Sequence, residues 1–161
     1  MTIAPEVVQL VPVRRRYLVV GWVSLSTHAP GFLVALPFAP RKVLALVLFG
    51  VLALLGACVT FAGNRYALKR VMVPPPPGAV VVPAPFPTLN VLATIGVTVL
   101  LVASSVMGRF SASILGIGFG SSFGLFWSAW KVAQFERDDG RRILREVGSW
   151  LDGASALYAG P

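Results

Sequence analysis

The chain has 161 residues, of which 56% are hydrophobic and 12% are charged, and its mean hydropathy is +0.79. Soluble domains carry about 25% charged residues and bury most of their large apolar side chains. A chain of this size has no room inside a water-soluble core for so many apolar groups. The composition therefore excludes an ordinary soluble globule and predicts that lipid covers the excess apolar surface.

The net charge is +8, from fourteen Lys and Arg residues and six Asp and Glu residues. The basic residues stand at the ends of apolar runs and are not interleaved with aromatics on a polar face, which favours membrane headgroups over nucleic acid as the partner. No carboxylate lies between Glu6 and Glu136, so the apolar runs lack the acid that proton relays and ion carriers need. The single cysteine, Cys58, excludes an intrachain disulfide.

Residues 1–40 are predicted to be an extended or interfacial segment. Three consecutive arginines at 14–16 and a shortage of acids are also typical of an organelle-import presequence, so cleavage of this segment stays an alternative. The apolar stretch from Tyr17 to Leu36 is long enough to span a bilayer, but prolines, a glycine and a histidine interrupt it. These interruptions are His28, Pro30, Gly31 and Pro37.

His28 is the only histidine, and no Cys, Asp or Glu lies near it in the sequence. A closed metal or haem site normally needs several donors. We therefore expect His28 to make a polar contact outside the membrane spans, and we expect the chain to hold no metal and no cofactor of its own.

The first membrane-spanning helix is predicted over residues 43–63. These twenty-one residues carry no charge and would cover roughly 31 Å as a helix, about the thickness of the hydrocarbon core of a bilayer. Basic residues flank both ends, so sliding the helix along the membrane normal would bury a cation. The flanking residues within 41–70 are Arg41 and Lys42 on one side and Arg65, Lys69 and Arg70 on the other.

A series of short motifs surrounds this span. In chain order they are Pro30-Gly31, Leu36-Pro37-Phe38, Arg41-Lys42, Phe49-Gly50, Phe61, Arg65 and Leu68-Lys69-Arg70. Residues 30–70 thereby resemble subunit VIIc of mitochondrial cytochrome c oxidase, a small single-span subunit. This chain has a longer and more apolar spacer between the first two motifs, and it continues for about ninety residues past the family's end. The resemblance implies an extended matrix segment followed by one span, with no catalytic residue.

Residues 71–88 form a proline-rich linker that separates an N-terminal module from a C-terminal one. Seven prolines exclude a helix and favour polyproline II, which makes a docked, semi-rigid spacer the preferred interpretation over a peptide ligand for an aromatic groove. A transmembrane hairpin is predicted next, over residues 89–130. Its two uncharged runs, 89–107 and 112–130, would measure roughly 63 Å as one helix, so the chain should turn near Gly108.

The second run of the hairpin has a small residue at every fourth position, which puts a row of small side chains on one helix face. The row consists of Ala112, Gly116, Gly120, Gly124 and Ser128. It predicts close helix packing. Residues 95–130 also resemble, more weakly, the hairpin subunit of the cristae-junction complex, although the first run lacks the matching glycines.

The tail, residues 131–161, is more polar. Trp127, Trp130 and Lys131 mark the membrane interface where the last span ends. Five apolar residues then follow helical spacing opposite several arginines, which predicts a short amphipathic helix on the membrane surface or against a partner. The apolar residues are Ile143, Leu144, Val147, Trp150 and Leu151.

The sequence thus predicts an all-α membrane protein with three transmembrane helices (43–63, 89–107 and 112–130), an extended N-terminal segment, a proline-rich linker and a C-terminal amphipathic helix. With three spans, six basic residues fall on one side of the membrane and eight on the other, so charge does not settle the orientation. Acidic lipid headgroups, including cardiolipin, are expected near Arg41, Lys42, Arg65 or Lys131.

The resemblance to subunit VIIc implies a non-catalytic accessory subunit of a respiratory complex of the mitochondrial inner membrane, cytochrome c oxidase first, with the other subunits of that complex and lipids as partners. Two alternatives stay open. One is a membrane-shaping or oligomer-forming protein of the cristae that assembles through the glycine row. The other is an accessory membrane subunit of ATP synthase. Pigment binding is disfavoured because the only imidazole lies outside the predicted spans.

Overall fold

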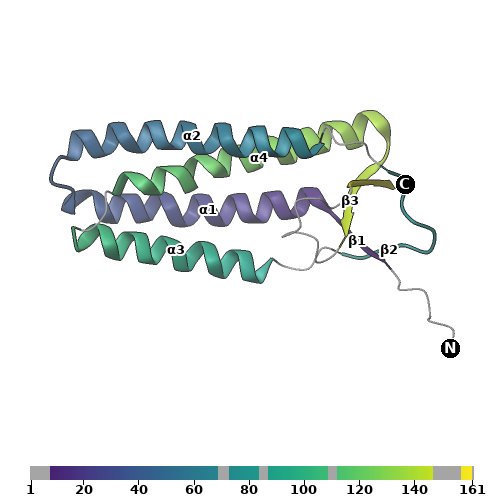
Figure 1. The fold of residues 1–161 in the computed structure, drawn as a ribbon, viewed down its shortest axis with the longest axis horizontal. Coiled ribbons are helices and arrows are strands. Elements are labelled where there is room, and N and C mark those ends of the chain that lie inside the picture. The colour runs from purple at the N-terminus through teal and green to yellow at the C-terminus, as the bar shows by residue number, and fades with distance from the viewer. Residues whose placement is uncertain (1–7, 69–72, 84–86, 109–111, 147–156, 161) are drawn as a thin grey trace.

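The computed structural model describes residues 8–68, 73–83, 87–108, 112–146 and 157–160. Four long helices run side by side, and a small sheet closes one end of the bundle (Figure 1). The helices are α1 (Val13–Ala35), α2 (Lys42–Leu68), α3 (Thr88–Val106) and α4 (Leu115–Asp139). The all-α, membrane-like fold class is therefore confirmed, and α2, α3 and α4 correspond to the three predicted spans.

The prediction of an extended or interfacial segment over residues 1–40 is wrong for residues 13–38, because residues 13–35 form the fourth long helix, α1, and a 3₁₀ turn follows it. Its buried residues recur every three or four positions and make one continuous face: Val13, Tyr17, Gly21, Ser24, His28, Phe32 and Ala35. Pro30 lies inside the helix and removes one backbone hydrogen bond, yet packing against α3 and α4 holds the chain helical. The helix gives way to a single 3₁₀ turn, Leu36–Phe38, where Pro37 sits.

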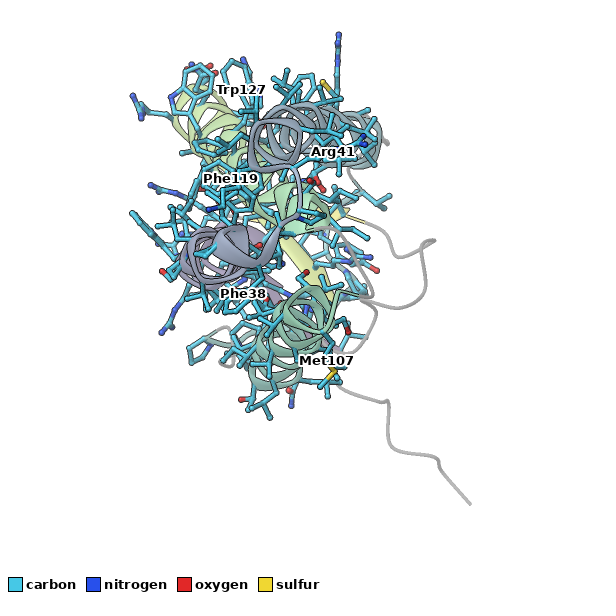
Figure 2. The ribbon with its side chains drawn as sticks, turned by 90° about the vertical axis from the view of Figure 1, so that its left-hand side faces the viewer. Phe38, Arg41, Met107, Phe119 and Trp127 are labelled. Atoms are coloured by element: carbon cyan, nitrogen blue, oxygen red, sulfur yellow. The ribbon has the colours of Figure 1, made fainter. Side chains whose placement is uncertain are left out.

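α4 is the central helix of the bundle. It packs along α2 on one side and along α1 on another, while α3 packs mainly on α1. Figure 2 looks along the bundle from the end opposite the sheet and shows this stacked arrangement, with α2 and α3 on the outside. Half of the most apolar stretch of α4 is buried, against 11% in α2 and in α3. The two outer helices therefore expose most of their side chains.

Within the described residues, four helices are long and apolar enough to cross a membrane, which is one more than the sequence predicted. Their exposed positions carry large apolar side chains along the full helix length, for example Val43 and Leu54 on α2 and Leu89 and Leu100 on α3. A water-soluble monomer rarely shows apolar surface of this extent. The fold is compatible with an integral membrane protein.

The small sheet joins parts of the chain that lie far apart in the sequence. Its strands are β1 (Gln9–Pro12), β2 (Val80–Val81), β3 (Arg142–Glu146) and β4 (Leu157–Gly160), in the order β2-β1-β3-β4. β1 is parallel to β2 and antiparallel to β3, and β3 is antiparallel to β4. The proline-rich linker thus supplies an edge strand and docks against the start of the chain.

The predicted amphipathic helix after residue 140 is wrong for residues 142–146, which form β3. α4 continues past Trp130 to Asp139 and ends at Gly140, whose φ of +66° is a left-handed cap that suits glycine. Ile143 and Leu144 are fully buried, and Ile143 joins a core with Val13 and other bundle residues. Adjacent apolar residues point to opposite faces of a strand, which lets both be covered. Val147, Trp150 and Leu151 lie outside the described residues.

Candidate functional site

The most concentrated group of polar side chains inside the bundle surrounds His28, in the middle of α1. The imidazole is only 7% exposed and faces both α3 and α4. Its Nδ1 atom lies 2.9 Å from the carbonyl oxygen of Ser24, one turn earlier, and its Nε2 atom lies 3.4 Å from Oγ1 of Thr98 on α3. Gly118 of α4 packs against the ring, and a methyl group at that position would overlap it. Three helices therefore meet at one side chain.

The hydroxyl groups around His28 each give their hydrogen to a backbone carbonyl. Ser24 donates to Gly118 across the helix interface at 2.8 Å, and Thr98 donates to Thr94 at 2.8 Å. Thr27 donates to Val23 at 2.9 Å. The ring is thus surrounded by oxygen lone pairs, and this pattern assigns the hydrogen of the neutral ring to Nδ1, which donates to the Ser24 carbonyl.

Nε2 has a different environment, because the Thr98 hydroxyl is its one polar neighbour. That hydroxyl can turn its hydrogen from the Thr94 carbonyl toward an unprotonated Nε2, or accept a hydrogen bond from a protonated one. Within the described residues, no three His, Cys, Asp or Glu side chains gather at one place. What the arrangement does directly is fix α1, α3 and α4 relative to one another.

The expectation that the only imidazole lies outside the spans is wrong, since α1 is itself a candidate span. Both ring nitrogens face protein atoms, so neither points to an open position where a pigment or metal would be ligated. A signal was present in the sequence. Ser24, Thr27 and His28 on one apolar helix, and Thr94 and Thr98 on another, recur at helical spacing, which places polar groups on one face of each helix.

The row of small residues begins at Ala112, in a 3₁₀ turn just before α4, and its glycines on α4 face α2. Gly116 lies against the backbone carbonyl of Phe49, Gly120 against that of Ala53, and Gly124 against Thr60. At the ends of the row, Ala112 is buried against α1, and Ser128 accepts a 2.8 Å hydrogen bond from Asn64 of α2. The structure therefore brings the row into contact with a neighbouring helix of the same chain.

The four predicted lipid-binding cations fall at opposite ends of the bundle. Arg41 and Lys42 lie at the start of α2, at the end away from the sheet, and both border surface hollows. Arg65 lies in the last turns of α2, near the sheet. Lys131 packs over the ring of Trp130, 4.7 Å from its centroid, and donates to Gln134. The structure does not bring the two pairs together.

A scan against protein-family models finds no match for this chain, and no curated protein and no solved structure matches it.

Replacing Gly120 by alanine is expected to destabilise the bundle. The added methyl group would overlap the Ala53 carbonyl on α2 and force the two helices apart, at a cost of about 1–3 kcal/mol in the free energy of unfolding. Gly96→Ala on α3 is the matched control, because a methyl group there meets no atom within 4 Å. Unfolding of the detergent-solubilised protein measures both. Equal stability of the two variants would contradict the close α2–α4 contact.

The contact between His28 and Thr98 is expected to appear as a coupling energy in a double-mutant cycle of His28→Leu and Thr98→Val. Polar contacts between membrane helices typically couple by about 0.6 kcal/mol and by up to about 1.7 kcal/mol. Ser121→Ala is the control partner, because the Ser121 hydroxyl donates to the Ile117 carbonyl within α4 and does not contact the His28 cluster. Its effect should add to that of His28→Leu. Additivity in both cycles would show that the cluster does not join α1 to α3.

Proposed function

We propose that this chain is an integral membrane protein that crosses the bilayer four times and serves as a non-catalytic, structural subunit of a larger membrane assembly. The observation that carries the proposal is the distribution of its side chains. α2 and α3 turn large apolar residues outward, whereas polar groups gather inside. Within the described residues, no buried side-chain nitrogen or oxygen lacks a hydrogen-bond partner. Lipid or apolar helices of other subunits are the surroundings that suit such a surface.

The number of spans also gives the proposed orientation. With four spans, both ends of the described chain and the α2–α3 connection lie at the sheet end of the bundle (Figure 1). In this proposed topology, sequence order alone assigns three of the fourteen basic residues, Arg41, Lys42 and Arg109, to the side opposite the sheet. It assigns the other eleven to the side of the sheet, and an excess of Lys and Arg marks the cytoplasmic side or its organellar equivalent. The sheet therefore lies on that side.

Membrane insertion and orientation have a direct test. The protein should stay with the membrane pellet after alkaline carbonate washing, because four spans hold it in the bilayer. A cysteine at Ala79, next to β2, should react with a membrane-impermeant maleimide only after the membrane is opened. A cysteine at Ala39, in the α1–α2 turn, should react in intact cells or in right-side-out vesicles. The native Cys58 is replaced by serine in both variants. The reverse pattern would contradict the orientation.

The structural role follows from how the helices are used. The small-residue row of α4 is occupied by α2 of the same chain, so it is not available for the self-association that the oligomer-forming alternative requires. α3, by contrast, packs mainly on α1 and exposes most of its length. α3 and the outer face of α2 are therefore the surfaces on which lipid or neighbouring subunits would pack.

The narrower form of the proposal is an accessory subunit of a mitochondrial inner-membrane respiratory complex, cytochrome c oxidase first. Its support is the resemblance over residues 30–70. In this chain Pro30-Gly31 lies within α1, and residues 13–68 form a helical hairpin where the resemblance implies an extended segment and a single span. What the resemblance keeps is the Leu36-Pro37-Phe38 turn and the basic pair Arg41-Lys42 that follows it.

Mass spectrometry of the native assembly tests the subunit role. We expect the chain in a fixed ratio with other membrane polypeptides, and, for the narrower form, with haem a and copper subunits. A photo-crosslinking residue at Leu100 of α3 or at Leu54 of α2, both largely exposed, should capture those polypeptides if they cover these faces. Recovery of the chain with ATP synthase subunits would contradict the assignment to cytochrome c oxidase and support the alternative of an ATP synthase subunit. Crosslinks only to further copies of this chain would overturn the subunit role.

A further inference from the structure

We propose that the hollow beside Arg41 binds the headgroup of an acidic phospholipid, and that the cations at the sheet end do not form such a site. The inference rests on the membrane placement proposed above. Arg41 immediately precedes α2. It lies at the end of the bundle that faces the viewer in Figure 2, as do Phe38 and Met107. Among the described residues, Arg41 and Lys42 are the charged residues at this end.

The hollow has a volume of about 310 Å³, within the range of small-molecule sites. It lies where the α1–α2 turn, the start of α2 and the end of α3 meet. Its walls include the aromatic ring of Phe38, the aliphatic side chains of Leu44 and Leu48, and the Ser105 residue of α3, with Arg41 as the one charged member. A second hollow on the other side of Arg41 includes Lys42. One guanidinium group therefore borders two adjoining depressions with apolar walls.

Charge complementarity identifies the occupant. The sequence has no Asp or Glu from residue 7 to residue 135, so neither connection at this end of the bundle contains a carboxylate. The side chains of Arg41 and Lys42 make no hydrogen bond or ion pair with any of the described residues. A phosphate supplies the missing negative charge, and Arg binds phosphate well because its planar fork matches the oxygens.

The apolar walls favour a lipid over a free anion. Below Arg41, the exposed side chains of Val43, Leu44 and Val47 continue along α2 in the direction of the helix axis. A phospholipid whose phosphate lies at Arg41 lays its acyl chains along these residues, so both parts of the ligand are matched. Inorganic phosphate would use only the cation and leave the apolar wall in contact with water.

The cations at the sheet end, Arg65 and Lys131, have carboxylates at the same end of the bundle, and Lys131 also has partners of its own. Lys131 already lies over Trp130 and donates to Gln134. The Asp and Glu residues among the described residues all lie at the sheet end: Glu136, Asp138 and Asp139 in the last turn of α4, and Glu146 in β3. A lipid phosphate approaching Arg65 or Lys131 therefore meets nearby negative charge, which reduces the attraction.

Two charge-matched variants test the assignment. Arg41→Gln/Lys42→Gln and Arg65→Gln/Lys131→Gln each remove two positive charges, from opposite ends of the bundle. The full chain is placed in nanodiscs of phosphatidylcholine with phosphatidylglycerol, and native mass spectrometry counts retained lipid. Juxtamembrane cations contribute about 1 kcal/mol each, so the first variant should retain phosphatidylglycerol about tenfold to thirtyfold less strongly, and the second should behave as the wild type.

A third variant separates the hollow from charge alone. Leu48→Trp keeps both cations and fills the apolar wall, so it should also lose phosphatidylglycerol. Thermal unfolding checks that each variant is folded. Equal loss in the two charge-matched variants, or competition by inorganic phosphate, would overturn the lipid site. Carbonate washing of membranes that contain the same variants distinguishes failure of the lipid site from failure of the membrane placement. A protein that stays in the pellet but does not retain phosphatidylglycerol selectively refutes the lipid site alone. A protein that is released into the wash refutes the membrane placement as well.

Discussion

The fold depends on how closely the backbone of α4 approaches its neighbours on two faces at once. Residues 116 and 120 lie one turn apart, whereas residue 118 points to the opposite side of the helix. Gly116 and Gly120 let α4 touch the backbone of α2, and Gly118 makes room for the imidazole of His28 from α1. Helices in lipid gain little from the hydrophobic effect, so such contacts and the hydrogen bonds across them hold the bundle together. Glycines on both faces are what make α4 central.

This central position explains the inside-out distribution of side chains. With α1 and α2 each resting on α4, the polar groups of α1 turn inward, where Ser24 reaches the Gly118 carbonyl and His28 reaches Thr98. The outer faces of α2 and α3 carry only apolar groups along most of their length. The sheet closes one end, because β1 leads directly into α1 and β3 follows α4 after Gly140, so the two inner helices are tied together by strand pairing as well as by packing.

The elements that could be predicted from the sequence are those whose local sequence pattern favours the same structure as their packing in the folded bundle. Long uncharged runs predicted α2 and α3, and the four-residue repeat of small side chains predicted the packing face of α4. α1 was missed because Pro30 and His28 weigh against a span when each is considered alone. In the folded chain His28 bonds to Ser24 in its own helix, and neighbouring helices offset the lost bond at Pro30. The sheet was missed because β1 pairs with β2 and with β3 across about 70 or more positions of the chain, and because Ile143-Leu144 fits a helix face and a strand equally well.

The missed helix also shows why orientation depends on the whole topology. Adding one span before residue 36 moves Arg14, Arg15 and Arg16 to the opposite side of the membrane from Arg41 and Lys42. A nearly even division of basic residues then becomes eleven against three. The same change places Arg41 and Lys42 at an end where the described residues include no carboxylate, next to a hollow with apolar walls. With three spans the basic residues do not indicate an orientation. With the proposed four spans they indicate which end of the bundle faces the more basic side, and they single out Arg41 and Lys42 as the pair proposed to bind an acidic headgroup.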